Sequence, residues 1–302
     1  MVTGGGQKRF WSGFFLSRAL GVCVFLGALL VVSAGATSAH PSVGAEEEQL
    51  RFEQDVDLLC LQRAYPDVVR GLEEGTDGTI WLVLHDGRKV LYADTAPVRY
   101  SSDGVPENAT VRQSMADVYP LEAACAVPPQ GVNPGRTRSA SLFAALYGSD
   151  RGSQKLVTVR MGAEQLQVAA RHGMDGAFRR VAAELERLAT DPAVRPFVFP
   201  LGGAFFWRVI SGTTRLSAHS YGIAIDLNPA HGAYWRWKRS RPQYAGYPQA
   251  IVELFEANGF IWGGKWNKFD LMHFEYRPEL LCKAHFMQTQ KPSVSGGKAV
   301  SK

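Results

Sequence analysis

The stretch TIWLVLHDGRKVLYAD (79–94) joins two hydrophobic segments through an Asp-Gly pair. This pair is a strong signal for a two-residue hairpin turn, and such a turn connects antiparallel strands. The stretches KLVTVRM (155–161) and EQLQVAA (164–170) predict a second pair of strands. The fold is therefore expected to contain antiparallel strands that pair with close neighbours in the sequence.

Helical patterns separate these strands at irregular intervals. Residues 50–66 predict a helix that Pro66 ends, and Asp175 can cap a helix that runs to about Leu188. A third helix is expected to begin near Pro248. An irregular mixture of helices and strands, without a repeat, is typical of the α+β class.

The N-terminus differs from the rest of the chain. Three basic residues precede an apolar run over 19–36, which ends in the small-x-small sequence Ala-Gly-Ala. This pattern predicts a secretory signal peptide over 1–36. The run is also close to the length of a membrane span, so an uncleaved anchor is the alternative. Both interpretations place the remaining chain outside the cytoplasmic membrane, in the periplasm or cell envelope.

The charge of the chain excludes one class of partner. The formal net charge is +5 and the pI is about 9.0, but loss of residues 1–36 removes three basic side chains and leaves about +2. Basic and aromatic residues do not alternate along a stripe, so nucleic acid is not an expected partner. The basic stretch 236–244 is interpreted as a solvated loop. Contact with a membrane is expected only through residues 19–36, if they are not cleaved.

Three cysteines remain after the signal peptide: Cys60, Cys125 and Cys282. In an oxidising compartment we expect a Cys60–Cys125 bridge that leaves Cys282 free, although three thiols do not determine a pairing. None of them has Cys-x-x-Cys spacing, which argues against a thiolate metal site.

The sequence is divided into successive segments. A polar linker is expected over 37–48, an N-terminal accessory region over 49–150, a domain that carries the candidate site over 151–287, and a disordered tail over 288–302. The accessory region carries no motif, and the sequence leaves open whether it is a separate domain or packs on the same core.

The candidate site begins with SAHSYGIAIDLN (217–228). Strand alternation in its second half places the isoleucines on one face and Asp226 on the other, so Asp226 faces a cleft. Gly222 permits a turn that could bring His219 over the same cleft.

The stretch FDLMHFEY (269–276) adds Asp270, His273 and Glu275. Two imidazoles and one carboxylate are a recurrent catalytic zinc set with one position open to water, whose pKa zinc lowers towards about 7. Asp270 and Glu275 are both candidates for the general base. On a straight strand Glu275 shares a face with His273, so Asp270 can serve only if the chain bends before His273.

These motifs resemble the zinc D-alanyl-D-alanine carboxypeptidase-like family. That family includes vancomycin-resistance-type D,D-carboxypeptidases and dipeptidases and phage L-alanyl-D-glutamate endopeptidases. Its pattern, Ser-x-His-x6-Asp followed by Asp or Glu-x2-His, is present in SAHSYGIAIDLN and GFIWGGKWNKFDLMHFEYRPEL, and the resemblance covers about 195–282. It implies a small antiparallel sheet with flanking helices around a zinc site, as in hedgehog-type and D,D-peptidase folds, here with an N-terminal α+β elaboration.

The resemblance also implies residue roles. One Zn²⁺ is bound by His219, Asp226 and His273, Asp270 is the general base, and Ser217 contacts substrate. Glu275 is then not the base but a residue that contacts the zinc ligands.

The family further uses an arginine upstream of the first ligand to hold substrate and stabilise the oxyanion. Arg208 is the first candidate for this role and Arg215, assigned to substrate binding, is the second. The tryptophans are expected either to wall a groove or to belong to the core: Trp235, Trp237, Trp262 and Trp266.

The implied function is that of an exported zinc metallopeptidase acting on peptidoglycan stem peptides, most simply a D-alanyl-D-alanine carboxypeptidase. An L-alanyl-D-glutamate-type endopeptidase is the first alternative. A non-catalytic, zinc-containing module that binds the cell wall is the second, because hedgehog-type relatives show that the fold can carry zinc without peptidase work.

Overall fold

A computed structural model describes residues 43–124, 128–237 and 246–290. The predicted signal peptide over 1–36, Cys125 and most of the basic stretch 236–244 lie outside the described residues. Within the described ranges, every helix is too short or too polar to span a bilayer.

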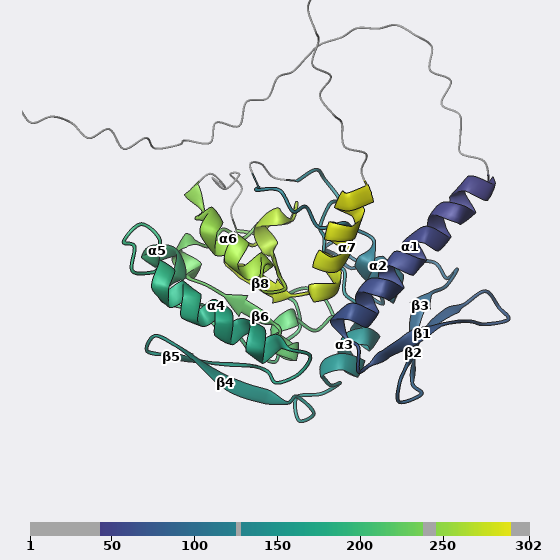
Figure 1. The fold of residues 1–302 in the computed structure, drawn as a ribbon, viewed down its shortest axis with the longest axis horizontal. Coiled ribbons are helices and arrows are strands. Elements are labelled where there is room, and N and C mark those ends of the chain that lie inside the picture. Colours follow the sequence, from purple (N-terminus) through teal and green to yellow (C-terminus); the bar gives the residue numbers. More distant parts are fainter. Residues whose placement is uncertain (1–42, 125–127, 238–245, 291–302) are drawn as a thin grey trace, which may run out of the picture. The chain divides into compact units, whose positions relative to one another are not determined.

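The described chain is a mixture of helices and short antiparallel sheets, which confirms the α+β class (Figure 1). The α-helices are α1 (Val43–Ala64), α2 (Val111–Met115), α3 (Ala140–Tyr147), α4 (Met174–Leu188), α5 (Arg195–Val198), α6 (Gln249–Glu256) and α7 (Pro278–Gln290). The strands are β1 (Val69–Glu74), β2 (Ile80–Leu84), β3 (Lys89–Ala93), β4 (Leu156–Met161), β5 (Glu164–Ala169), β6 (Ala224–Asp226), β7 (Phe260–Trp262) and β8 (His273–Tyr276). Short 3₁₀ helices are η1 (Ala218–Tyr221), η2 (Pro229–His231) and η4 (Gly263–Lys265).

Both predicted strand pairs are present. The hairpin β2–β3 turns at the Asp-Gly pair, and β4 pairs with β5 from Leu156 opposite Ala169 to Met161 opposite Glu164. Strand β1 was not predicted, and it completes a sheet of order β1-β2-β3. Its sequence, VRGLEE, has too few apolar residues to show an alternating pattern. The third sheet, of order β6-β8-β7, carries the candidate site.

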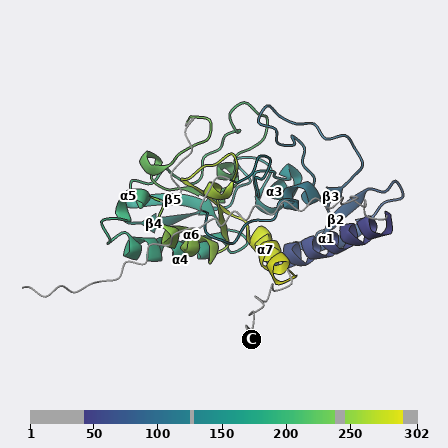
Figure 2. The ribbon, with the colours of Figure 1, turned by 90° about the horizontal axis from the view of Figure 1, so that it is seen from above.

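Helices α1 and α7 lie side by side in both ribbon views, although they come from opposite ends of the described chain (Figures 1 and 2). A disulfide joins Cys60 on α1 to Cys282 on α7, with their Cα atoms 5.5 Å apart. The expected Cys60–Cys125 pairing with a free Cys282 is therefore wrong. The two bonded cysteines are 222 residues apart, and only the packing of the two helices brings them together.

Two helices extend into segments that were expected to be irregular. Helix α1 begins at Val43, so the second half of the expected linker 37–48 is helical. Helix α7 continues to Gln290, beyond the expected start of the tail at 288. His40–Lys302 form one compact unit, so the accessory region 49–150 packs on the same core as the rest instead of forming a domain of its own.

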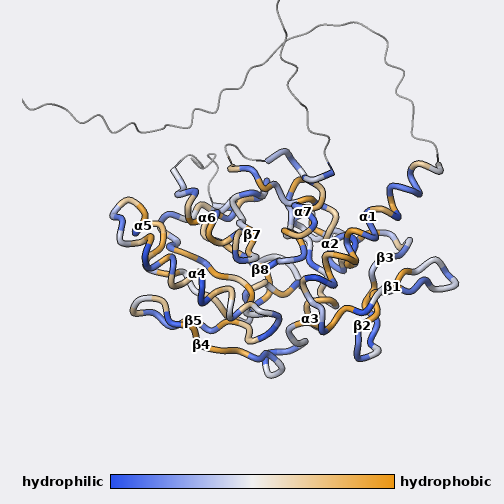
Figure 3. The backbone as a smooth tube through the Cα atoms, viewed as in Figure 1, coloured by the Kyte–Doolittle hydropathy of each residue, from blue (hydrophilic) through white to orange (hydrophobic). Residues whose placement is uncertain are grey.

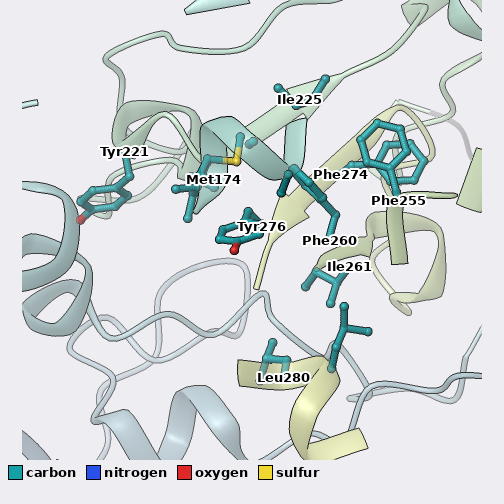
Figure 4. Packing of buried hydrophobic residues seen from close by; sticks show 14 of the residues in the cluster. Met174, Tyr221, Ile225, Phe255, Phe260, Ile261, Phe274, Tyr276 and Leu280 are labelled. Carbon is teal, nitrogen blue, oxygen red and sulfur yellow. The ribbon is translucent and has the colours of Figure 1, made fainter. Parts of the chain in front are cut away.

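The site sheet rests on a tightly packed apolar layer. The helices change between hydrophobic and hydrophilic residues along their length, as expected for elements with one buried face (Figure 3). Phe274, in the central strand β8, stacks on Phe255 of α6 with ring centroids 3.8 Å apart (Figure 4). Phe255 and Phe274 are both fully buried. This packing holds β8 in place, and with it His273, which begins the strand.

Candidate metal centre and catalytic pocket

The pairing of β6 with β8 brings two predicted ligands together. The strands are antiparallel, and Asp226 lies directly opposite His273 while Ala224 lies opposite Glu275. Side chains of directly opposite residues point to the same face of a sheet, with Cβ atoms about 5 Å apart. A separation of 47 residues in the sequence thus becomes one cross-strand pair.

The third ligand comes from the 3₁₀ turn η1, just before β6. Ser217 caps this turn, and its hydroxyl accepts the backbone N–H of His219 at 3.4 Å. Gly222 ends the turn with a φ of +69°, and a Cβ at this position would lie 2.8 Å from the backbone nitrogen of Ala169. The tight turn that the glycine permits places His219 beside Asp226, as the sequence predicts.

The hydrogen bonds of His219 determine which ring nitrogen is available. Nδ1 lies 2.5 Å from the carbonyl oxygen of Ala204, and because a carbonyl only accepts, Nδ1 carries the proton. In the neutral ring Nε2 then presents a lone pair. Nε2 is buried, lies 3.1 Å from Oδ2 of Asp226, and makes no hydrogen bond among the described residues. A nitrogen lone pair and a carboxylate oxygen repel each other at this distance, and a cation between them would remove the repulsion.

His273 is held between two carboxylates. Its Nδ1 lies 2.9 Å from Oδ1 of Asp226, and its Nε2 lies 3.5 Å from Oε2 of Glu275. Burial by itself lowers the pKa of His273, but the bonds to both carboxylates outweigh it and raise the pKa to about 9. Burial acts in the opposite sense on Asp226, and the two imidazoles still hold the pKa of Asp226 well below its usual range.

The three side chains fit a zinc ion. One ligand atom from each of His219, Asp226 and His273 lies within 4.8 Å of the other two. The set contains two imidazoles and one carboxylate, which zinc prefers, and one of its nitrogens has no hydrogen-bond partner among the described residues. Three protein ligands would leave a fourth position for water or substrate.

A network of buried charged side chains connects to the cluster through Glu275. Arg138 donates from Nε to Oε1 of Glu275 at 2.8 Å and from Nη2 to Oε2. Nη1 of Arg277 lies 3.3 Å from the same Oε1, while its Nε donates to Glu279, which also accepts the Tyr65 hydroxyl at 2.7 Å. Despite burial, the arginines and His273 keep the pKa of Glu275 well below its usual range. Glu275 is therefore an ionised partner of His273, as the resemblance implied.

Asp270 occupies the bend that its expected role requires. The backbone N–H of His273 donates to the carbonyl of Asp270 at 3.2 Å, and the N–H of Asp270 donates to that of Gly263 at 3.0 Å. A Cβ on Gly263 would lie 2.5 Å from the carbonyl oxygen of Asp270, so the close approach needs glycine. Oδ1 of Asp270 is buried and has no hydrogen-bond partner among the described residues. Burial raises the pKa of Asp270 to about 7.

These groups share one pocket. It is lined by His219, Asp226, Asp270 and His273 together with Arg136, Arg138, Arg208, Ser211, Ser217, Tyr234, Trp237, Trp266 and Met272. Two of the predicted substrate-contact residues, Arg208 and Ser217, thus reach the pocket, and Arg208 is solvent-exposed there.

Arg215 is different, and the expectation that it contacts substrate is corrected. It is not among the residues that line the pocket. Its side chain is buried, and Nη2 lies 2.6 Å from Oδ2 of Asp103. The guanidinium is therefore committed to an internal ion pair with the accessory region.

The tryptophans divide between the two expected roles. Trp266 and Trp237 line the pocket, and Trp237 is 78% exposed at its rim. Trp262 belongs to the buried core, and Trp235 packs against that core while partly buried.

Two charged pocket residues were missed by sequence reasoning. Arg136 and Arg138 come from the accessory region 49–150, which carries no motif, and both reach the pocket. They lie just before α3, in a segment without hydrophobic periodicity. In such a segment the sequence does not distinguish an arginine that lines a pocket from one on the surface. Only the packing of this segment against η4 and β8 reveals them.

A cluster that could hold a metal, beside a carboxylate with an unpaired buried oxygen and in a pocket lined with arginines, is an arrangement typical of metallohydrolases. Residues 211–276 match the family model described as D-alanyl-D-alanine carboxypeptidase. This match supports the resemblance to D,D-carboxypeptidase-like peptidases over that segment. No solved structure matches the chain. Arg136, Arg138 and Arg208 lie outside the matched segment.

Proposed function

We propose that the protein is an exported zinc peptidase that removes the terminal D-alanine from peptidoglycan stem peptides. One observation carries the proposal: the His219–Asp226–His273 cluster and the unpaired carboxylate of Asp270 share one pocket, within a segment that matches this peptidase family.

The residues of the site divide the chemistry between them. His219, Asp226 and His273 would hold Zn²⁺, which when bound supplies a Lewis acid that activates water and polarises the scissile carbonyl. Asp270 takes a proton from the attacking water and delivers it to the leaving amine. A base is most effective when its pKa is close to the working pH, and burial brings the pKa of Asp270 to about 7.

Residues at the rim of the pocket orient the peptide. Arg208 presents an exposed guanidinium that can stabilise negative charge developing on the carbonyl oxygen. Ser217 offers a hydroxyl deeper in the pocket. The rings of Trp237 and Tyr234, 5.0 Å apart, form an aromatic wall against which the stem peptide can pack.

The site favours catalysis over a purely structural metal. A structural zinc site needs no general base, and a buried carboxylate oxygen without a hydrogen-bond partner costs folding free energy. Asp270 carries this cost beside the cluster. Such a group is expected where a proton has to be moved, which disfavours the non-catalytic wall-binding module.

The test uses purified residues 37–302 with muropeptides that carry pentapeptide stems, with and without a chelator, and mass spectrometry of the products. Loss of a single alanine that the chelator abolishes is the expected result. Cleavage elsewhere in the stem would change the specificity to that of an endopeptidase. Intact stems in zinc-replete protein would reject the peptidase and leave the binding module.

A further inference from the structure

Arg136 lies close to the metal cluster although it comes from the accessory region. Its guanidinium carbon is 5.5 Å from the ring centroid of Trp266 and 5.9 Å from that of Trp235. The Trp266 ring is in turn 5.5 Å from the ring of His273. One indole ring therefore separates Arg136 from a predicted zinc ligand, and Arg136 and Trp266 both line the pocket.

The guanidinium of Arg136 is buried but poorly satisfied. Nη2 lies 3.5 Å from Oδ2 of Asp103 and Nη1 lies 3.4 Å from the carbonyl of Lys268, which are long hydrogen bonds. Nε has no hydrogen-bond partner among the described residues. The side chain is only 9% exposed, so little water compensates for the missing bonds. Arg136 thus retains donors for a ligand that enters the pocket.

The neighbouring pocket residue Arg138 does not share this property. Arg138 also lines the pocket, but its guanidinium donates twice to the buried carboxylate of Glu275. Asp103, the acidic partner of Arg136, is bound more closely by Arg215, at 2.6 Å. The negative charge of Asp103 is therefore largely compensated by Arg215, and the positive charge of Arg136 remains available to the pocket.

We propose that Arg136 binds the free C-terminal carboxylate of the substrate, which makes the accessory region 49–150 the determinant of carboxypeptidase specificity. The planar guanidinium matches a carboxylate in a bidentate arrangement, and stacking on two indole rings holds its plane in place. An endopeptidase substrate has an amide at this position and offers no charge to bind. This inference rests on the proposed peptidase function and names the chemical feature that the site selects.

The experiment measures binding separately from turnover. The ligand is a D-alanyl-D-alanine analogue in which a phosphinate replaces the scissile amide, prepared as the free C-terminal acid and as the C-terminal amide. Titration calorimetry gives the affinity of each form for the zinc-loaded protein. Cleavage of acylated D-alanyl-D-alanine and of its C-terminal amide is followed in parallel.

Arg136→Gln is compared with Arg215→Gln as the matched control. Both substitutions remove one partner of Asp103, but only Arg136 reaches the pocket. We expect the wild-type protein to prefer the free acid by on the order of 10- to 100-fold, as for hydrogen bonds to a charged group. Arg136→Gln should reduce this preference to within a few-fold, mainly through the Kd and KM of the acid, while Arg215→Gln keeps it.

Four outcomes would overturn the proposal. A preference that survives in Arg136→Gln places the carboxylate elsewhere, and an equal loss in both variants shows a structural effect of the Asp103 network. A wild-type protein that binds acid and amide equally has no carboxylate site, although cleavage of stem peptides would still uphold the peptidase function. Absence of both binding and cleavage would reject that function together with the inference.

Discussion

At the scale of single residues, the candidate metal site depends on one backbone carbonyl. Ala204 accepts the Nδ1 proton of His219 and so directs the Nε2 lone pair towards Asp226 and His273. Ala204 lies outside the matched segment, and its contribution is a carbonyl that any residue could supply. The three residues of the cluster were predictable from the sequence because their motif is specific, whereas this orienting contact was not.

The ligand and base roles predict separable defects. His219→Ala should lose bound zinc and activity together, because it removes one of three ligands. Asp270→Asn should keep zinc at about one equivalent per chain and lose activity by on the order of 10²- to 10⁴-fold, as expected for loss of a general base. Metal analysis of the purified variants and cleavage of pentapeptide muropeptides give the two readouts. An Asp270→Asn protein with full activity would transfer the base role to another group.

The raised pKa of Asp270 predicts the pH dependence. A base works only when deprotonated, so kcat/KM should rise with pH through the pKa of Asp270. Burial places that pKa at about 7 without metal, above the usual 3.8, and a bound cation lowers it from there. We therefore expect an acid limb with its midpoint between these two values and a slope of about tenfold per pH unit below it. A rate that does not change across this range would show that Asp270 does not control the reaction.

At the scale of secondary-structure elements, the turn between η1 and β6 positions the first ligand. Gly222→Ala should lower the free energy of unfolding by about 1–3 kcal/mol, because the left-handed φ disfavours a side chain and the new Cβ meets the backbone of Ala169. It should also weaken zinc binding. Gly78→Ala is the matched control, with a φ of +77° and nothing within 4 Å of its Cβ. Equal destabilisation and equal zinc affinity in both variants would show that only the φ matters.

The elements also show how far sequence patterns reach. Alternation in GIAIDLN correctly placed Asp226 away from the apolar face, and the bend that Asp270 needs is present. Strand β1 and helix α7 were missed, because β1 is polar and α7 follows the last motif. Arg215 was assigned to substrate binding because it lies close to His219 in the sequence. Its ion pair with Asp103, 112 residues away, could not be seen from that spacing. Local patterns predicted local structure and the motif residues, while contacts between distant segments required the fold.

At the scale of the whole molecule, the disulfide closes nearly the entire described chain. A loop of this length is expected to stabilise the folded state by about 5 kcal/mol in the chain-entropy model. The double variant Cys60→Ser/Cys282→Ser should therefore melt on the order of 10 °C lower. The buried pair of Lys283 and Asp57, 2.7 Å apart, remains to hold α1 against α7.

Differential scanning fluorimetry of the double variant and of reduced wild-type protein gives the comparison, and both should show the same lower Tm. Identical melting of the oxidised and reduced wild-type proteins would show that this bond does not stabilise the fold. Zinc content should be unchanged in the double variant, because neither cysteine lies in the pocket.

The buried charges behind His273 have a consequence for the modularity of this enzyme. They run from Tyr65 through Glu279 and Arg277 to Glu275, and Arg138 reaches Glu275 from the accessory region. A truncated protein confined to the family segment would lack Arg138, so the buried carboxylate of Glu275 would lose an ion-pair partner. Removing one partner of a buried ion pair costs about 3–5 kcal/mol of folding free energy. The segment that carries the motifs is therefore not expected to fold stably on its own. Any graft that carries the cluster into another scaffold must bring Arg138 and Arg277 with it.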